Sequence, residues 1–319
     1  MRAYILRRLL MFVPVLMAAS VLIFALMRVL PGDVAVMILV GPGGEGQASP
    51  EALAKLRADL GLDQPLFVQY VAWLKDVVQL NLGTSYASSR TVVTELSQRL
   101  PITIELAFLA IIMTMLVALP AGVVSAIRQN TWLDYLLRVV SVAGLTIPTF
   151  FTATLLILWL VTSFRWLPPI ELVGLFNNPV ENLTQLIWPA VMLAFYHGAV
   201  ISRMTRSQML EVLRQDYVRT AWAKGLEERL VVVRHALQNA LLPVVTIAGL
   251  EFGVLLGGTV VMETIFVLPG VGSYIVESIR ARDYPVLQAI ILMMALSYLV
   301  INLVVDLCYA WLDPRIRYA

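Results

Sequence analysis

The sequence predicts an all-helical membrane protein with six transmembrane helices and a small helical segment outside the membrane between the first two. The 319-residue chain is 60% hydrophobic and 14% charged, whereas soluble domains carry about 25% charged residues. Its apolar residues gather in runs of about 20, the length that crosses a bilayer core. A net charge of +2 and a single cysteine, Cys308, argue against a nucleic-acid binder, a disulfide framework and a Cys/His zinc site.

The first span is expected over residues 9–29, after Arg7 and Arg8. A signal peptide is the alternative, but the apolar run is too long and ends without a small-residue cleavage site. Five further spans are expected at 102–127, 136–162, 187–204, 241–262 and 286–311. Prolines inside spans remove a backbone hydrogen bond and kink helices. The clearest such position is Pro148, which is expected to be either a fixed kink or a flexing point.

The basic residues predict the orientation of the chain. With the N-terminus inside, 14 of the 23 Lys and Arg residues face the cytoplasm, as the positive-inside rule requires. Both termini are then cytoplasmic. We therefore expect an N-terminal transmembrane helix (1–30), an extracytoplasmic helical segment (31–101) and a five-helix core (102–319) that includes a cytoplasmic loop (211–243).

The extracytoplasmic segment contains signals for two short helices. Ser49, Pro50 and Glu51 are typical of a helix start, which predicts a helix over 50–60 that ends at Gly61. A second, amphipathic helix is expected over 65–79. These helices form either a lid that docks a partner or a cap packed on the chain's own helices.

The loop after the fourth span predicts a helix, a glycine and an amphipathic helix. Asp216 is expected to cap a short helix over 217–224 that breaks at Gly225. The next helix carries an apolar stripe at helical spacing. The stripe consists of Leu226, Leu230, Val233, Leu237 and Leu241. This pattern is typical of a docking element, but an ordinary interfacial helix has the same appearance.

Several motifs in this loop and along the chain resemble ATP-binding-cassette (ABC) importer permeases of the dipeptide/oligopeptide/nickel type. The loop motifs, similar to the family's "EAA" loop, are Tyr217-Val218-Arg219-Thr220-Ala221-Trp222-Ala223-Lys224-Gly225 and Arg234-His235-Ala236-Leu237-Gln238-Asn239-Ala240-Leu241-Leu242-Pro243. The others are Leu30-Pro31-Gly32-Asp33, Leu60-Gly61-Leu62-Asp63-Gln64-Pro65, Leu82-Gly83-Thr84-Ser85, Leu100-Pro101-Ile102-Thr103-Ile104-Glu105, Glu263-Thr264-Ile265-Phe266-Val267-Leu268-Pro269-Gly270 and Asp313-Pro314-Arg315. Trp222 and Glu251 stand where close relatives have Arg and Gln.

The resemblance implies a type I ABC importer permease fold and a bacterial or archaeal cytoplasmic membrane location. It implies a heterodimer with a second permease, two cytoplasmic ATPase subunits and an extracytoplasmic solute-binding protein. The chain has no GxxxxGK[ST] phosphate loop, so we expect no enzyme activity, cofactor or metal, with ATP used by the partner subunits. Dipeptides, oligopeptides, nickel complexes and sugars all remain possible substrates.

The resemblance also implies which residues contact the ATPase. They are Tyr217, Arg219, Thr220, Ala221, Ala223, Lys224, Gly225, Arg234, His235 and Asn239. The small residues among them would let the backbone approach a partner closely. No nucleophile accompanies His235, so a structural hydrogen bond is expected in place of catalysis.

Two further candidate sites lie near the fifth span. Glu251 follows Pro243 by eight residues, about 12 Å along a helix, and an ionisable residue at this depth is a functional candidate. It either lines the translocation path, where it would attract a peptide ammonium group, or pairs with a partner subunit. The apolar residues Phe266, Leu268 and Pro269 are candidates for an outer gate. A secondary transporter and an intramembrane enzyme are the competing functions, but the sequence has neither an internal repeat nor a catalytic constellation.

Overall fold

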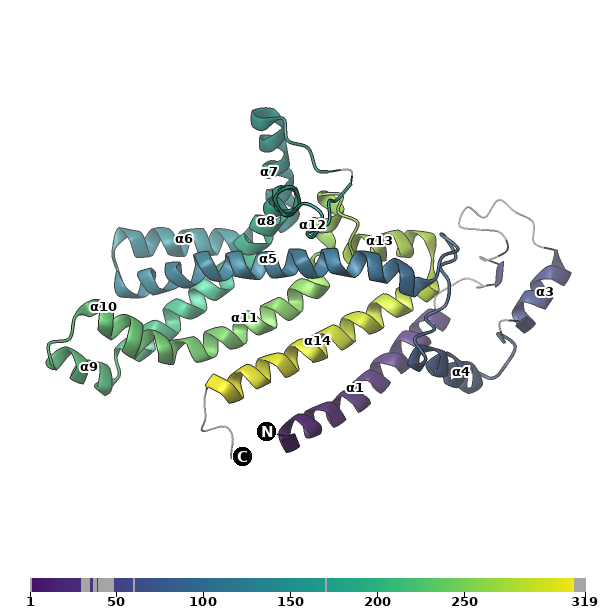
Figure 1. Cartoon of the computed structure of the whole chain (residues 1–319), viewed down its shortest axis with the longest axis horizontal. Helices are drawn as coiled ribbons and strands as arrows, with labels where there is room; N and C mark the ends of the chain where they lie inside the picture. Colours follow the sequence, from purple (N-terminus) through teal and green to yellow (C-terminus); the bar gives the residue numbers. More distant parts are fainter. Residues whose placement is uncertain are drawn as a thin grey trace. The chain divides into compact units, whose positions relative to one another are not determined.

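The computed structural model describes residues 2–29, 35–36, 39, 49–59, 61–169 and 171–312. The regular structure among these residues is helical, apart from one isolated bridge between Thr84 and Thr91. The helices are α1 (Arg2–Val29), α3 (Pro50–Asp59), α4 (Leu66–Val78), α5 (Val92–Ile127), α6 (Trp132–Thr146), α7 (Thr149–Phe164), α8 (Pro179–Leu213), α9 (Asp216–Ala223), α10 (Glu228–Leu230), the π-helix η1 (Val231–Leu237), α11 (Gln238–Gly258), α12 (Val260–Ile265), α13 (Val271–Ala281) and α14 (Tyr284–Leu312) (Figure 1). The motifs at 30–33 and 313–315, and Leu60, lie outside the described residues.

Five of the described helices are long and apolar enough to cross a membrane. The number of possible spans is six if the bent pair α6 and α7 counts as one span. The chain divides into two compact units, 1–102 with 269–299 and 103–268 with 300–319. The long helices α5 and α14 contribute residues to both units. The fold class predicted from the sequence, an all-helical membrane protein, is therefore confirmed.

In the first unit, α4 packs on α1 through aromatic side chains. The Tyr70 ring lies edge-on to that of Phe24, 5.5 Å between centroids, and its hydroxyl is 2.8 Å from the Ser20 hydroxyl. The predicted start and stop of α3 are confirmed: Ser49 Oγ accepts a hydrogen bond from the backbone of Ala52, and Gly61 is left-handed at φ +63. α4 thus contacts α1 of its own chain, although neither α3 nor α4 has a fully buried residue.

A polar junction in the first unit ties the segment before α5 to the start of α14. Asp283 is buried, and it accepts hydrogen bonds from the Ser85 hydroxyl and the Ala87 backbone at 2.5 and 3.3 Å. Burial, with a smaller contribution from the Asp283 charge, raises the pKa of the neighbouring Tyr86 hydroxyl to about 12. The raised pKa reflects the apolar surroundings of the Tyr86 hydroxyl and the nearby Asp283.

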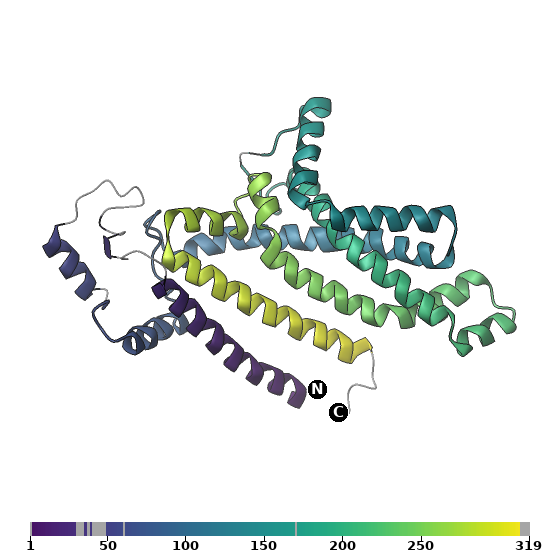
Figure 2. The same cartoon turned by 180° about the vertical axis from the view of Figure 1, so that it is seen from behind.

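The second unit is built around α8, which contacts α6, α7, α11 and η1. Close approach to α8 requires small residues on its neighbours, as expected for helices in a membrane. A Cβ atom at Gly122 of α5 would lie 2.6 Å from the Ser202 carbonyl oxygen of α8, and one at Gly144 of α6 would lie 3.0 Å from that of Phe195. Beyond the end of α8, α9 and α10 form a hairpin that leads back into α11, and the view from behind shows the same hairpin (Figure 2).

The third span, predicted over 136–162 with a kink at Pro148, is sharply bent at that proline. The chain forms two helices there, α6 and α7, at 104° to one another. The break falls at Pro148, the predicted position of the kink. Proline has no N–H to donate, and it disfavours helical geometry in the residue before it. Ile147 accordingly has an extended backbone, with φ −80 and ψ 125.

The second span begins earlier than predicted. α5 starts at Val92, ten residues before the expected position, and passes through Pro101 without ending. The first turns of α5 carry polar side chains such as Glu95 and Arg99, which ion-pair at 3.4 Å. Hydropathy marks only the membrane-embedded part of a helix, so the polar extension of α5 escaped the prediction.

Candidate functional site

The loop between α8 and α11 is held together by its own small core. Val218 and Ala221 of α9 and Val231 of η1 are buried against one another. Gly225, which ends α9, has φ +77, and no atom lies within 4 Å of the position a Cβ would take. The glycine therefore provides a left-handed turn with open space on its outer side.

Three of the predicted coupling residues interact directly. The Asn239 amide donates to the Tyr217 hydroxyl at 3.0 Å and to the His235 carbonyl at 2.9 Å. The Tyr217 hydroxyl also lies 3.5 Å from that carbonyl. These contacts join α9 to the end of η1 and hold the hairpin closed. The contact at His235 uses its backbone carbonyl.

The remaining predicted coupling residues lie mostly at the surface. Ala221 is buried, whereas the other residues of this set are exposed. The exposed ones are Arg219, Thr220, Ala223, Lys224, Gly225 and Arg234. Arg219 pairs only with Asp216, at 3.4 Å, and both side chains are exposed, so this ion pair adds little stability.

The predicted apolar stripe contains both exposed and half-buried residues. Leu230 and Val233 are 40% and 52% exposed, whereas Leu226, Leu237 and Leu241 are half-buried. The buried face of η1 and α11 is formed by residues four apart, namely Val232, Ala236, Ala240, Val244 and Ala248. The first two lie in η1, a π-helix, whose wide turn regular 3.6-residue spacing does not anticipate.

The loop has an apolar outer face. Tyr217, Trp222, Leu230 and Val233 are each 40–52% exposed. Lys224 and Arg234 of the same loop are exposed as well. A mixture of exposed aromatic and aliphatic side chains with flanking charge is typical of a protein contact surface.

The structure pairs Glu251 of α11 with His197 of α8. His197 Nδ1 lies 2.5 Å from Glu251 Oε2, and the side chains are 6% and 18% exposed. The Tyr196 ring stands edge-on to the imidazole at 5.1 Å. Glu251 has no other hydrogen bond within the described residues, so its second carboxylate oxygen is available to a ligand. The sequence placed His197 in the fourth span but did not indicate this pairing.

A second acid–base pair was missed by the sequence analysis. The fully buried Asp134 of α6 accepts two hydrogen bonds from the Arg206 guanidinium of α8, at 2.8 and 2.9 Å. It also accepts from the Ser125 hydroxyl at 2.6 Å and the Asn130 backbone at 3.0 Å. The only sequence signal was an acid in the first turn of an apolar helix, which is a common helix-start feature.

The candidate gate residues differ in their surroundings. Phe266 and Leu268 are buried in the main core cluster of the second unit, whereas Pro269 is exposed. The adjacent Glu263 is fully buried and accepts from the Thr103 and Thr259 hydroxyls at 2.8 and 2.7 Å. These contacts fix the turn that follows α12.

Comparison with known proteins identifies the family. Residues 118–318 match the profile described as binding-protein-dependent transport system inner membrane component, and residues 1–107 match its N-terminal counterpart. The dipeptide transport system permease protein DppB of Alkalihalophilus pseudofirmus is 42% identical over the full length of both chains. The glutathione transport system permease protein GsiC of Escherichia coli is 39% identical over 99% of both chains.

A solved structure agrees on the fold. The methionine ABC transporter MetNI, in inward-facing conformations, matches 69% of this chain and 97% of its own with a TM-score of 0.57 at 16% identity. The expected permease fold is thereby confirmed, and the full-length relatives confirm the expected family. The chain is a multi-pass inner-membrane protein that belongs to the binding-protein-dependent transport system inner membrane components, as the permease subunit of an ABC importer.

Proposed function

We propose that this permease carries short peptides, including glutathione-like ones, and that the loop over 211–243 couples it to ATPase subunits. The substrate proposal rests on the full-length similarity to dipeptide and glutathione permeases. The partners are two ATPases, a solute-binding protein and a second permease that completes a heterodimer. Both termini lie in the cytoplasm, and segment 31–101 lies outside.

The observation that carries the coupling proposal is the apolar outer face of the loop. Tyr217, Trp222, Leu230 and Val233 are exposed, although the same hairpin buries its other apolar residues. The outward residues come from both arms of the hairpin, and the closing contacts of Asn239 hold those arms together. A rigid hairpin of this kind transmits movement between an ATPase and α8 and α11, which continue from its two ends.

Glu251 is the proposed contact for a cationic group on the translocation path. Glu251 and His197 form a polar pair between two apolar helices. The second carboxylate oxygen of Glu251 accepts no hydrogen bond within the described residues. A peptide ammonium would find there a negative charge in surroundings of low dielectric, where such attraction is strong. Phe266, Leu268 and Pro269 are the proposed outer gate, with the two buried side chains anchoring the turn.

The coupling proposal is tested by co-purification of the ATPase with Trp222→Ala. Loss of an aromatic side chain at the centre of a contact weakens binding by about 2 kcal/mol or more, so ATPase retention falls by about tenfold or more. Phe176→Ala is the matched control, because Phe176 is more exposed still but lies in the loop before α8, at the other end of that helix. Equal retention by Trp222→Ala and the native chain contradicts the coupling assignment.

A further inference from the structure

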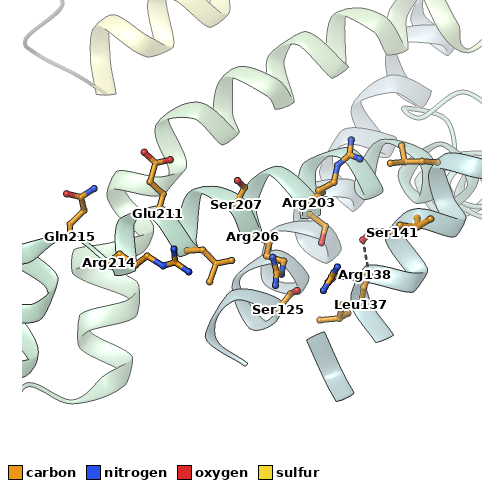
Figure 3. Close-up of a pocket in the computed structure, with 14 residues that line it drawn as sticks. Ser125, Leu137, Arg138, Ser141, Arg203, Arg206, Ser207, Glu211, Arg214 and Gln215 are labelled. Carbon is orange, nitrogen blue, oxygen red and sulfur yellow. Dashed lines mark hydrogen bonds between the residues drawn. The ribbon is translucent and has the colours of Figure 1, made fainter. Parts of the chain in front are cut away.

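A cavity of about 790 Å³ lies where the ends of α5, α6 and α8 meet. Ser125 is near the last residue of α5, Arg138 is in the second turn of α6, and the residues of α8 belong to its final turns. The cavity is therefore at the end of the spans that adjoins the coupling loop. Its lining includes four arginines, Arg138, Arg203, Arg206 and Arg214 (Figure 3).

These arginines are not equivalent. Arg206 is neutralised by Asp134. Within the described residues, Arg138, Arg203 and Arg214 form no ion pair, and Arg138 only lies over the Tyr135 ring, 5.7 Å from its centroid. Glu211 is the one acid in the lining, so the cavity keeps two net positive charges. Figure 3 shows the guanidinium groups of Arg138 and Arg206 turned toward the same space beside Ser125.

The rest of the lining combines polar side chains, Ser125, Ser141, Ser202, Ser207 and Gln215, with an apolar wall. Leu137, Val142 and Leu145 of α6 and Leu210 of α8 complete the wall. The outer face of α6 continues the apolar surface, with Leu136, Val139 and Val140 exposed. A site for a small soluble anion does not require this apolar extension, whereas a site for a molecule with a charged head and apolar chains does.

The depth of the cavity in the membrane follows from its aromatic neighbours. Trp132 and Tyr135, at the start of α6, are 75% and 53% exposed. Exposed Trp and Tyr side chains concentrate at the level of the lipid headgroups. Arg138 lies about one turn further along α6 than Tyr135, which places its guanidinium within reach of lipid phosphates.

We propose that this cavity binds the headgroup of an anionic phospholipid. The phosphate is placed at Arg138, with Arg203 lining the same cavity, and the acyl chains run along the exposed face of α6. Basic pockets between transmembrane helices on the cytoplasmic side suit such headgroups. The assignment to the cytoplasmic leaflet rests on the orientation given under the proposed function. A bound lipid would bridge α6 and α8, the helices already joined by Asp134 and Arg206.

The test uses the complete transporter, purified in mild detergent, with phosphatidylglycerol or phosphatidylcholine of identical acyl chains added. Native mass spectrometry measures the lipid retained. The native protein is expected to retain phosphatidylglycerol in preference to phosphatidylcholine. We expect Arg203→Gln to weaken phosphatidylglycerol retention about fivefold, and the double variant R138Q/R203Q to weaken it by a similar further factor. Arg128→Gln is the matched control, because Arg128 follows α5 at the same end without lining the cavity.

Three results would overturn the proposal. The first is equal phosphatidylglycerol retention by R138Q/R203Q and the native protein. The second is displacement of the lipid by inorganic phosphate at comparable concentration, which indicates a free-anion site. The third is loss of the ATPase together with the lipid in Arg203→Gln, which indicates a protein contact. Failure of the coupling proposal is seen separately, because Trp222→Ala then keeps its ATPase whatever the lipid measurement shows.

Discussion

The second unit contains two acid–base pairs that join α8 to a neighbouring helix, and they differ in how completely they are satisfied. Asp134 is fully buried and accepts four hydrogen bonds, two of them from Arg206. Glu251 makes one contact, with His197, and stays 18% exposed. A saturated pair has no capacity left for a ligand, whereas an unsaturated one does. This difference supports a structural role for the first pair and the proposed transport role for the second.

The largest expected effect is the loss of the saturated pair. Asp134→Ala leaves the Arg206 guanidinium and the Ser125 hydroxyl without their acceptor, and breaking a buried pair destabilises proteins by about 3–5 kcal/mol. The measurement is thermal unfolding of the purified permease in detergent, in which the midpoint falls sharply.

Asp216→Ala is the control for this experiment, because its pair with Arg219 has the same charges but is exposed. Its unfolding midpoint is expected to match that of the native protein. If Asp134→Ala behaves like Asp216→Ala, the structural role of the buried pair is disproved.

An intermediate effect is expected at the unsaturated pair, on transport and not on assembly. Glu251→Gln keeps the size of the side chain and removes its charge. A hydrogen bond to a charged group contributes about 1.5–3 kcal/mol, so uptake of a peptide with a free ammonium group falls by about tenfold or more. Uptake into proteoliposomes that contain the complete transporter is the measurement.

The matched control is Glu171→Gln, which removes an exposed carboxylate elsewhere in the same unit. Native uptake by Glu251→Gln would show that Glu251 does not contact the transported solute. If Glu251→Gln lowers the unfolding midpoint but leaves uptake per folded molecule unchanged, Glu251 has a structural role like that of Asp134.

The smallest effect is expected at His197. His197→Gln keeps a hydrogen-bond donor near Glu251 and leaves the carboxylate in place. Uptake is therefore expected to fall by no more than about threefold, which corresponds to less free energy than a typical neutral hydrogen bond contributes. His197→Leu removes the donor and lowers uptake further. If both variants match Glu251→Gln, the imidazole itself contacts the solute, and the two residues form one binding site.

The accuracy of the sequence predictions depended on the range of the interactions involved. The ends of α3 were predicted because Ser49 and Gly61 act on adjacent backbone groups. The break at Pro148 was located, but its 104° angle was not, because proline interrupts a helix without determining where the next one packs. The apolar stripe did not indicate the buried positions Val232 and Ala236, since regular helical spacing does not anticipate the wider turn of the π-helix η1.

The candidate site divides in the same way. The coupling loop was found from a continuous motif, and the contact between Tyr217 and Asn239 adds only its closure. Glu251 was identified because a carboxylate inside an apolar span is conspicuous. Its partner His197 lies 54 residues away, and Asp134 is 72 residues from Arg206. No local pattern connects positions on separate helices.

The sequence by itself determined that this protein is a multi-span permease with a loop between its fourth and fifth spans, because hydropathy and motifs are properties of contiguous residues. The tertiary structure decided which side chains meet, namely Glu251 with His197 and Asp134 with Arg206. It also decided which face of the loop is outward and where the arginine cavity lies. The physical reason is that apolar length places a helix in the membrane, whereas only packing against its neighbours sets its rotation.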